Sequence, residues 1–325
     1  MTLVINIGST NTKYSIFDNN LNLLSKGKTE SIESIVEQNP IEVIIVRIVF
    51  GGVFCDPIIL NLGALKHLSE YNIYAPLHNP IMIDCVTKLI GNYPDVKFYG
   101  VFDSAFYKDM SESEYKLPLP NAILKKNPLL RRFGYHGFSH QSIDHQYQDR
   151  IKKDKYTIIS CHLGGGSSIT AIINGKPVAT SMGFGPEEGL VMVKRTGDIG
   201  ANLILTLIDK KHSTDDIRNM IYKESGILGI SGSDEIKKVF ESSETQDILA
   251  YQMFINSIEK YLGYYIFKLD NKIDAVILTG GIGENSSIVQ NYFKQKLSKI
   301  GIDLITLTTN EELEMIKAIR YIKLI

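Results

Sequence analysis

Short apolar segments alternate with amphipathic ones along the whole chain. Segments rich in Val, Ile and aromatic residues predict strands at Leu3–Ile7, Tyr14–Phe17, Val43–Phe50, Lys97–Phe102, Thr157–Leu163, Ile169–Ile173 and Asp274–Thr279. Apolar residues that recur with a helical period predict helices at Ile81–Ile90, Thr214–Tyr222, Gln246–Leu269 and Glu311–Ile322. Strands and helices mixed in this order predict an α/β fold.

The chain also contains an internal repeat. The segment Leu3–Asn19 aligns without a gap with Ile158–Gly175 at an offset of 156 residues, so that Gly8 falls on Gly164 and Thr12 falls on Ser168. Both segments read as a strand, a small polar turn and a second strand. Two such hairpins half a chain apart indicate a duplicated domain.

The segment between the two halves, residues 117–140, contains three prolines. Pro118, Pro120 and Pro128 exclude a regular helix or a central strand here, because proline lacks an amide donor and clashes with the preceding helical turn. We expect an irregular crossing near a cleft between the halves.

The overall composition is that of a globular protein with a sizeable core, since 44% of the residues are hydrophobic and 22% are charged. The net charge of −1 gives no electrostatic reason to expect binding to nucleic acid or to an anionic membrane. The most apolar window, Ile41–Phe54, is too short to span a bilayer, and the N-terminus shows no signal-peptide pattern. Three widely spaced cysteines argue against a disulfide framework or a zinc site, so we expect a cytoplasmic protein.

Two turns have the composition of phosphate-binding loops. In Gly8–Thr12 and Gly164–Ser168, glycine allows close approach of the backbone, and successive amides and hydroxyls can donate to oxygens. Lys13 adds a positive charge to the first turn. Either turn alone is more often an ordinary hairpin turn, and it is their repetition that favours phosphate binding. The segment Leu278–Ser286 runs from a strand through glycines into a helix start and is either a nucleoside site or a strand–helix loop.

Ten motifs in this sequence are similar to those of the acetate kinase family, within the superfamily of acetate and sugar kinases and actin-like ATPases. They are NIGSTNTK (6–13), RIVFGG (47–52), APLHNP (75–80), VFDSAF (101–106), RRFGYHGFSH (131–140), CHLGGGSS (161–168), TSMGFGPEEGLVMVKRTGDI (180–199), SGILGISG (225–232), TGGIGENS (279–286) and TTNEEL (308–313). They follow the order of the family and extend over most of the chain.

The resemblance implies a duplicated actin-like (ribonuclease H-like) ATPase fold with two domains flanking a cleft. The first domain would comprise residues 1–106 and 312–325, and the second, residues 107–311, would bind the nucleotide and form a homodimer. The implied activity is acetate kinase, a reversible phosphoryl transfer from ATP to acetate that gives acetyl phosphate and ADP. The implied cofactor is Mg²⁺, with Mn²⁺ as an alternative.

The resemblance assigns catalytic roles to Asp103, His136 and Arg195. His136 would stabilise the transferring phosphoryl group, and Arg195 would be the second arginine of the site. A carboxylate substrate is already ionised at pH 7 and needs no general base. We therefore interpret Asp103 as orienting Arg47 or magnesium-bound water. Together with magnesium, Arg47, Arg195 and His136 would surround the equatorial phosphoryl oxygens.

The resemblance also implies that Arg47 binds the carboxylate substrate. The small apolar pocket for the methyl group of the substrate would be formed by Val49, Leu77, Tyr135 and Pro186. Arg47 lies inside an apolar strand, where an unpaired charge is costly. It therefore needs an anionic partner, and a carboxylate or phosphoryl oxygen would serve.

The resemblance assigns the nucleotide to Lys13, His162, Leu163, Gly164, Gly165, Gly166, Asp234, Glu235, Ile236, Gly281, Ile282, Gly283, Glu284 and Asn285. Asn6 and Glu311 resemble the magnesium-site residues. Glu311 has a competing interpretation, because Thr308-x-x-Glu311 is also the pattern of a capping box at a helix start.

The chain departs from the family mainly near the nucleotide. Gly165 stands where the family usually has asparagine, and Ile236 stands in the place of an arginine. These changes predict weaker nucleotide binding while the residues expected to perform the chemistry are retained. Three other functions remain as alternatives. One is a propionate kinase, which shares every motif given above. The others are a pyrophosphate- or polyphosphate-using relative and a non-catalytic sensor of nucleotide or acetyl phosphate.

Overall fold

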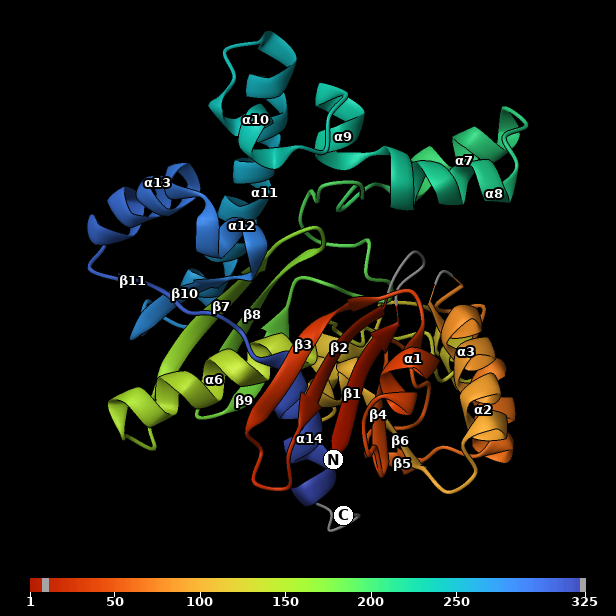
Figure 1. The fold of residues 1–325 in the computed structure, drawn as a ribbon. Helices are drawn as coiled ribbons and strands as arrows, with labels where there is room; N and C mark the ends of the chain where they lie inside the picture. The colour runs from red at the N-terminus through yellow and green to blue at the C-terminus, as the bar shows by residue number, and fades with distance from the viewer. Residues whose placement is uncertain (8–11, 77, 322–325) are drawn as a thin grey trace. The chain divides into compact units, whose positions relative to one another are not determined.

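The computed structural model describes residues 1–7, 12–76 and 78–321, without the side chain of Tyr321. The chain divides into two compact units. Unit 1 comprises Met1–Lys108 and Asn310–Ile325, and unit 2 comprises Asp109–Thr309. Each unit contains one mixed β-sheet with helices packed against it, which confirms the predicted α/β class (Figure 1).

Unit 1 is built on a six-stranded sheet in the order β3-β2-β1-β4-β6-β5. Its elements are β1 (Thr2–Ile7), β2 (Thr12–Phe17), β3 (Leu23–Thr29), α1 (Ile32–Glu37), β4 (Val43–Ile48), β5 (Ile58–Ile59), α2 (Leu62–Ser69), α3 (Asn79–Asn92), β6 (Lys97–Phe102), the 3₁₀ turn η1 (Asp103–Tyr107) and α14 (Glu311–Tyr321). Helix α14 packs against β1, β4 and β6 and buries Met315, Ile316 and Ile319. The C-terminal helix thus completes the core of the N-terminal unit.

Unit 2 is built on a five-stranded sheet in the order β11-β10-β7-β8-β9. Its elements are α4 (Glu112–Tyr115), α5 (Asn121–Lys126), α6 (Gly137–Ile151), β7 (Thr157–Leu163), β8 (Ser167–Ile173), β9 (Lys176–Thr180), α7 (Ala201–Asp209), α8 (Thr214–Asn219), the π-helical turn η2 (Met220–Glu224), α9 (Gly226–Ser231), α10 (Ile236–Glu241), α11 (Thr245–Lys268), β10 (Ala275–Thr279), α12 (Gly280–Asn285), α13 (Ser287–Ser298) and β11 (Asp303–Thr306). The core forms where β7, β8 and β10 pack against α11 and α13.

The two sheets are copies of one topology. In both, three antiparallel strands (β3-β2-β1 and β9-β8-β7) are followed by two strands parallel to the innermost one (β4-β6 and β10-β11). The duplicated domain expected from the repeat is therefore confirmed, and with it the duplicated actin-like fold that the resemblance implies. Since parallel strands end on the same side, each sheet gathers the carboxyl ends of three neighbouring strands at one edge.

The gapless alignment of the repeat is wrong by one residue in its second strand. β1 pairs with β2 so that Ile7 faces Thr12, whereas β7 pairs with β8 so that Leu163 faces Ser167. The first turn is therefore one residue longer than the second. Thr12 corresponds to Ser167 in the sheet, and not to Ser168.

All seven predicted strands and all four predicted helices are present, with shifted ends at several of them. The expectation for the proline-rich segment is wrong in part. A short helix, α5, begins directly after Pro120 and ends before Pro128, and α6 begins at Gly137. Proline is tolerated at the start of a helix because the first amides have no partner inside the helix, so Pro120 precedes α5 without disrupting it.

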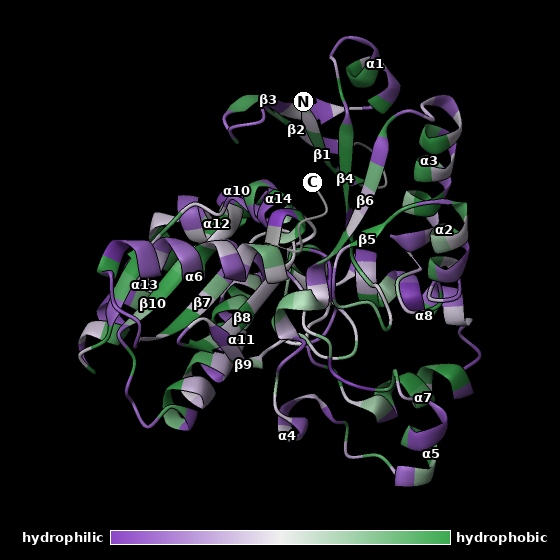
Figure 2. Ribbon diagram, turned by 90° about the horizontal axis from the view of Figure 1, so that it is seen from below, coloured by the Kyte–Doolittle hydropathy of each residue, from purple (hydrophilic) through white to green (hydrophobic). Residues whose placement is uncertain are grey.

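The helices differ in how much of their surface is buried. Helix α11 buries a stripe that includes Phe254, Ile258 and Leu262, whereas α7 contains no buried residue although most of its residues are apolar (Figure 2). In the part of the chain that the structure describes, no helix combines the length and the apolar character needed to cross a bilayer.

Candidate functional site

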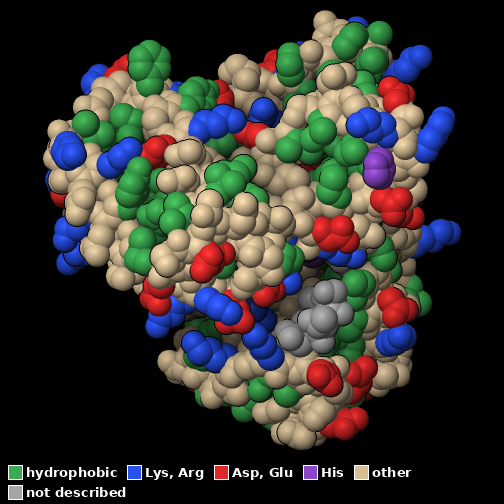
Figure 3. Space-filling view, turned by 90° about the horizontal axis from the view of Figure 1, so that it is seen from above, with side chains coloured by type: hydrophobic (Ala, Val, Ile, Leu, Met, Phe, Trp, Pro, Cys, Tyr) green, Lys and Arg blue, Asp and Glu red, His purple; other side chains and the backbone are tan. Residues whose placement is uncertain are grey.

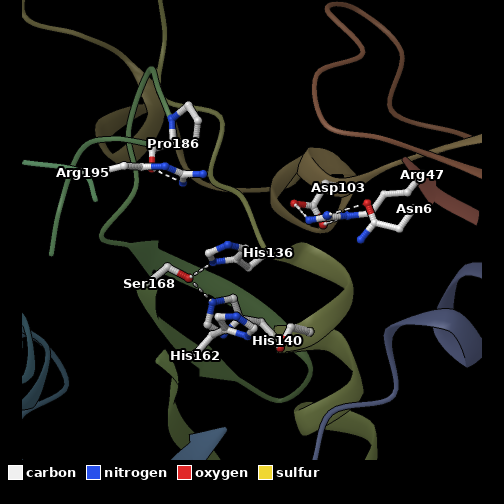
Figure 4. A network of polar contacts seen from close by, with 10 residues as sticks. Asn6, Arg47, Asp103, His136, His140, His162, Ser168, Pro186 and Arg195 are labelled. Carbon is white, nitrogen blue, oxygen red and sulfur yellow. Dashed lines mark hydrogen bonds and ion pairs between the residues drawn. The ribbon is translucent and has the colours of Figure 1, made fainter. Parts of the chain in front are cut away.

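Three polar side chains of unit 1 meet where neighbouring parallel strands end. Asn6 is near the end of β1, Arg47 is near the end of β4, and Asp103 directly follows β6. Nη2 of Arg47 donates to Oδ2 of Asp103 at 2.8 Å, and Nε lies 3.4 Å from Oδ1. Nη1 of Arg47 donates to Oδ1 of Asn6 at 3.3 Å (Figure 4). The carboxyl edge of an α/β sheet, where ligands commonly bind, thus carries a guanidinium held in a fixed plane.

The anionic partner expected for Arg47 is supplied from within the chain. The side chain of Asp103 is 0% exposed and that of Arg47 is 13% exposed, so the pair is largely removed from water. Burial disfavours the charge of Arg47, but the neighbouring Asp103 and Glu311 outweigh this and raise the pKa of Arg47. The carboxylate of Asp103 is therefore an anionic partner of the kind that the sequence led us to expect for Arg47. Asp103 makes the contact that an orienting residue requires.

Glu311 begins α14, and the helix is capped by another residue. The side chain of Asn310 accepts from the amide of Leu313 at 3.2 Å, whereas Thr308 donates its hydroxyl to Glu284 at 2.9 Å. The predicted capping box between Thr308 and Glu311 is thus not formed. The capping-box interpretation of Glu311 is therefore wrong.

The surroundings of Glu311 fit a divalent cation. Burial raises the pKa of its carboxyl group, Arg47 and Lys13 oppose this, and the charge of Asp103 adds to it. Asn6, Asp103 and Glu311 together offer the amide and carboxylate oxygens that Mg²⁺ prefers, and Mg²⁺ needs only one or two protein carboxylates beside water and phosphate. Among the described residues, no group of three or more His, Cys, Asp or Glu side chains forms a fully protein-made metal site.

Two predicted parts of unit 1 cannot be placed. Leu77 and the phosphate turn Gly8–Asn11 lie outside the described residues. Val49 directly follows β4, two residues after Arg47, and is half-buried. Val49 therefore lies close to Arg47 along the chain. Arg47 is expected to bind the carboxylate of the substrate, and Val49 is expected to contact its methyl group.

In unit 2, the predicted catalytic residues surround the turn between β7 and β8. A Cβ atom placed on Gly166 would lie 3.1 Å from Nε2 of His136 and 3.3 Å from Nη1 of Arg195. His136 has a left-handed backbone (φ +57°) at the start of α6, which is uncommon for a residue other than glycine and marks a constrained position. The turn, the imidazole and the guanidinium therefore converge on one small space that only glycine leaves open.

The loop that follows β9 holds Arg195 and part of the predicted methyl pocket. Nη1 of Arg195 donates to the carbonyl oxygen of Pro186 at 3.1 Å, and Oη of Tyr135 donates to the carbonyl oxygen of Phe184 at 2.8 Å. Tyr135 and Pro186 are both buried. The carboxylate of Glu188 accepts from the amide of Phe184 at 2.9 Å and so fixes the loop.

A cavity of about 600 Å³ opens beside the glycine turn of unit 2. It is lined by seven predicted nucleotide-site residues: Gly164, Gly165, Asp234, Ile236, Gly281, Ile282 and Asn285. Its volume is in the range of small-molecule pockets. Glycines on two sides leave backbone amides accessible, which suits phosphate. Apolar Ile236 and Phe240 provide a surface for a flat base.

The other predicted nucleotide residues do not line this cavity. Lys13 belongs to unit 1, whereas His162, Leu163, Gly166, Glu235, Gly283 and Glu284 belong to unit 2. Leu163 is fully buried in the core. Glu284 accepts from the amide of Gly280 at 2.9 Å and from Thr308 at 2.9 Å, so its carboxylate ties the loop to the sheet.

Sequence reasoning missed part of the cavity wall. Val193, Lys237, Phe240, Glu241, Ser286, Ser287 and Ile288 line it as well. Lys237, Phe240 and Glu241 follow Ile236 on α10, so a helical projection of this segment could have indicated them. Val193 and Ser286 lie within matched motifs, and Ser287 and Ile288 directly follow one, but none of the four belongs to the predicted set.

Comparison with known sequences shows what this chain is similar to. The profile of the acetokinase family matches residues 21–317. An acetate kinase of Mycoplasma genitalium is 30% identical over 339 aligned positions, which cover 92% of this chain and 86% of that protein. An acetate kinase of Acetivibrio thermocellus is 36% identical over 311 positions, which cover 93% of this chain and 76% of that protein.

Solved structures show the same similarity. A propionate kinase from Francisella tularensis superposes with a TM-score of 0.89 at 27% identity, covering 98% of both chains. An acetate kinase from Porphyromonas gingivalis superposes with a TM-score of 0.86 at 26% identity, covering 99% of both chains. Because the family profile matches most of this chain, the chain belongs to the acetokinase family.

Proposed function

We propose that this protein is an ATP-dependent acetate kinase that transfers a phosphoryl group reversibly between ATP and acetate. The observation that carries the proposal is Arg47, whose guanidinium is held by Asp103 at the carboxyl edge of the first sheet. Acetate kinases among the relatives support acetate as the acceptor.

Unit 1 would bind the acceptor. Acetate is small and carries a single negative charge. A hydrogen-bond donor held in a fixed orientation therefore matters more for its binding than a large pocket. Arg47 keeps its planar fork in position because both carboxylate oxygens of Asp103 hold it. Val49, on the same strand end, would contact the methyl group.

Unit 2 would bind the nucleotide in the glycine-lined cavity. The base would contact Ile236 and Phe240, and the phosphates would run toward Gly164–Gly166. His136 and Arg195 would then donate to the transferring phosphoryl group. Phosphoryl transfer demands alignment and charge neutralisation from the protein and little covalent chemistry, so fixed donors are the main requirement.

Magnesium would be held through Asn6, Asp103 and Glu311. When bound, it would neutralise charge on the phosphate oxygens. Asp103 would orient Arg47, and no residue needs to remove a proton from acetate. We place this reaction in the cytoplasm, where ATP is available.

A homodimer is proposed through α7. Its exposed apolar side chains include Leu203 (48%), Leu205 (58%) and Ile208 (45%). Helix α7 contacts α8 but buries none of its own residues, so a second copy of the chain would cover its apolar surface. Figure 3, which views the side of α9 and α10, shows several groups of exposed hydrophobic side chains. Leu205→Asp should shift the mass measured by light scattering from dimer to monomer, whereas Leu62→Asp, in unit 1, should leave the dimer intact.

The function is tested by measuring acetyl phosphate as its hydroxamate, with ATP, GTP and pyrophosphate as separate donors. We expect product with ATP, in equal amount to ADP, and a dependence on Mg²⁺. Propionate is assayed in parallel, because the Francisella tularensis relative is a propionate kinase. Activity with pyrophosphate alone would overturn the donor, a higher kcat/KM for propionate would replace the acceptor, and ADP binding without turnover would favour a sensor.

A further inference from the structure

A chain of hydroxyl and imidazole groups runs through the interior of unit 2 and ends at His136. Oγ of Ser160, on β7, lies 2.9 Å from Nδ1 of His140, on α6. Nε2 of His140 lies 2.7 Å from Oγ of Ser168, on β8. The same hydroxyl lies 3.0 Å from Nδ1 of His136 (Figure 4). Ser160, His140 and Ser168 are each 0% exposed, so water does not interrupt this chain.

His140 has one donor and one acceptor in this chain. Burial, and to a lesser degree the neighbouring His162, lower the pKa of His140 well below its ordinary value, so the ring is neutral near pH 7. A neutral imidazole carries a proton on one nitrogen and a lone pair on the other. If Ser168 accepted from both histidines, its own hydroxyl proton would be left without an acceptor among the contacts that it makes within the described residues, which is costly. When Ser168 donates in one of its two contacts, the protons of the chain can point in only two ways.

In the first arrangement all donors point toward His136. Ser160 donates to Nδ1 of His140, Nε2–H of His140 donates to Ser168, and Ser168 donates to Nδ1 of His136. Every hydroxyl proton then has an acceptor. Neutral His136 must in that case carry its own proton on Nε2.

In the second arrangement all donors point away from His136. His136 donates from Nδ1 to Ser168, Ser168 donates to Nε2 of His140, and Nδ1–H of His140 donates to Ser160. The hydroxyl proton of Ser160 is then left without an acceptor, since its contact with His140 is the hydrogen bond that this side chain makes within the described residues. A buried donor without an acceptor is costly, so the first arrangement is favoured.

We propose that His140 is a positioning residue that, through the hydroxyl of Ser168, fixes His136 as the tautomer with its proton on Nε2. This atom faces the glycine turn, because a Cβ atom on Gly166 would lie 3.1 Å from it. The Nε2–H group is therefore directed to the space that Arg195 also borders. The opposite tautomer would direct a lone pair into that space.

The consequence for catalysis rests on the proposed function. A phosphoryl oxygen beside Gly166 would accept from Nε2–H of neutral His136, whereas a lone pair on Nε2 would repel it. No proton is transferred in this role. The surroundings of His136 are consistent with a neutral ring, because the guanidinium of Arg195 borders the same space and would disfavour a second positive charge there.

The tautomer can be measured directly by long-range ¹H–¹⁵N correlation spectra of protein labelled in its seven histidines, without any ligand. His136 is assigned from the spectrum of His136→Gln. We expect a protonated Nε2 and an unprotonated Nδ1 for His136 at neutral pH. A proton on Nδ1, or an equal mixture of the two tautomers, in the wild-type protein would overturn the proposal whether or not the protein has kinase activity.

Variants test whether His140 imposes this tautomer. His140→Met should give a mixture of tautomers at His136 and lower kcat by about tenfold to 100-fold, the usual effect of removing a group that orients a functional ligand, with little change in KM for acetate. His140→Gln places an amide donor toward Ser168, so it should retain most of the preference for the Nε2–H tautomer of His136 and most of kcat. Ser168→Ala is the second test if His140→Met does not fold. Thr170→Val removes a buried hydroxyl from the same strand as Ser168 and should change neither the tautomer of His136 nor kcat. An unchanged tautomer in both His140→Met and Ser168→Ala would contradict the role of the chain.

Discussion

The two sheets have the same strand order, but their carboxyl edges carry different chemistry. In unit 1, the ends of β1, β4 and β6 bring together Asn6, Arg47 and Asp103, which form a charged and hydrogen-bonded group. In unit 2, β7 ends in the glycine turn 164–166, and β10 runs into Gly280 and Gly281. The duplicated fold therefore supplies the same edge twice, and the residues placed there decide the ligand.

The difference follows from the size and charge of the two proposed ligands. A small carboxylate offers few atoms, so it must be recognised by a directed cation such as Arg47. A nucleotide offers many phosphate oxygens, which backbone amides can reach if side chains are absent. Gly280 has φ +79°, and a Cβ atom there would lie 2.7 Å from the carbonyl oxygen of Leu163, so glycine also permits the close packing of α12 on β7.

The largest expected effect comes from changing the cation of unit 1. Arg47→Lys keeps the charge but loses the planar fork that both oxygens of Asp103 hold. We expect kcat to fall by about 10³-fold or more, as for other arginines that act on phosphoryl transfer. Arg218→Lys alters an exposed arginine paired with Asp215 and should have no effect. Near-normal turnover of folded Arg47→Lys would show that this edge does not bind the reacting groups.

The glycine turn of unit 2 is tested by adding one methyl group. Gly166→Ala would place a Cβ atom against Nε2 of His136 and Nη1 of Arg195, at 3.1 and 3.3 Å. Displacement of such groups by about 1 Å can cost about 10²-fold in rate, so we expect a loss of that size. Gly263→Ala, on α11, meets no atom within 4 Å and serves as the control. Steady-state kcat, with circular dichroism to verify folding, decides the outcome.

Acceptor size is expected to depend on Val49. Shortening this side chain beside Arg47 should make room for one more methylene, and one methylene is worth about 10–200-fold in kcat/KM. Val49→Ala should therefore shift the ratio of kcat/KM for acetate to that for propionate by about tenfold toward propionate. A wild-type enzyme that already prefers propionate would remove the basis for this prediction.

The smallest expected effect concerns the nucleotide. Ile236 lines the cavity, and it cannot make the stacking or hydrogen-bonding contacts of the arginine that the family has at this position. The loss of one such contact lowers the affinity for the nucleotide by roughly 5–30-fold. We expect GTP to work within about tenfold of ATP, and Ile236→Arg to lower KM for ATP. Strong rejection of GTP by the wild-type enzyme would show that Lys237 or Glu241 reads the base instead.

The fold could be predicted well where apolar residues dominate. β6 and β7 match their predicted ends. β6 is a run of buried apolar and aromatic residues after Lys97, and β7 is rich in buried apolar residues. Helix α6 was missed because its buried side is polar and includes Ser139, His140 and Asp144. β3 was missed because it is an exposed edge strand held by pairing with β2, a contact that leaves little trace in its own sequence.

The site could be predicted as residue identities but not as contacts. The repeat and the motifs indicated Arg47, His136 and the glycine turns. The resemblance suggested that Asp103 orients Arg47, but it did not indicate the pairing through both oxygens. Nor did it indicate that Ser168 links two histidines, since such contacts join residues distant in sequence. The one-residue error in the repeat arose because a change in turn length moves a whole strand without altering its pattern.

The division of ligands between the two units is tested most directly by calorimetric titration of ADP in the presence of EDTA, which removes any coupling through a metal. The account predicts that Arg47→Lys binds ADP within about twofold of the wild-type protein, because a change of less than about 0.4 kcal/mol is expected for a residue outside the nucleotide site. Ile236→Glu, which places a negative charge in the cavity, should bind ADP at least about tenfold more weakly. Weakened binding in Arg47→Lys together with unchanged binding in Ile236→Glu would contradict the account.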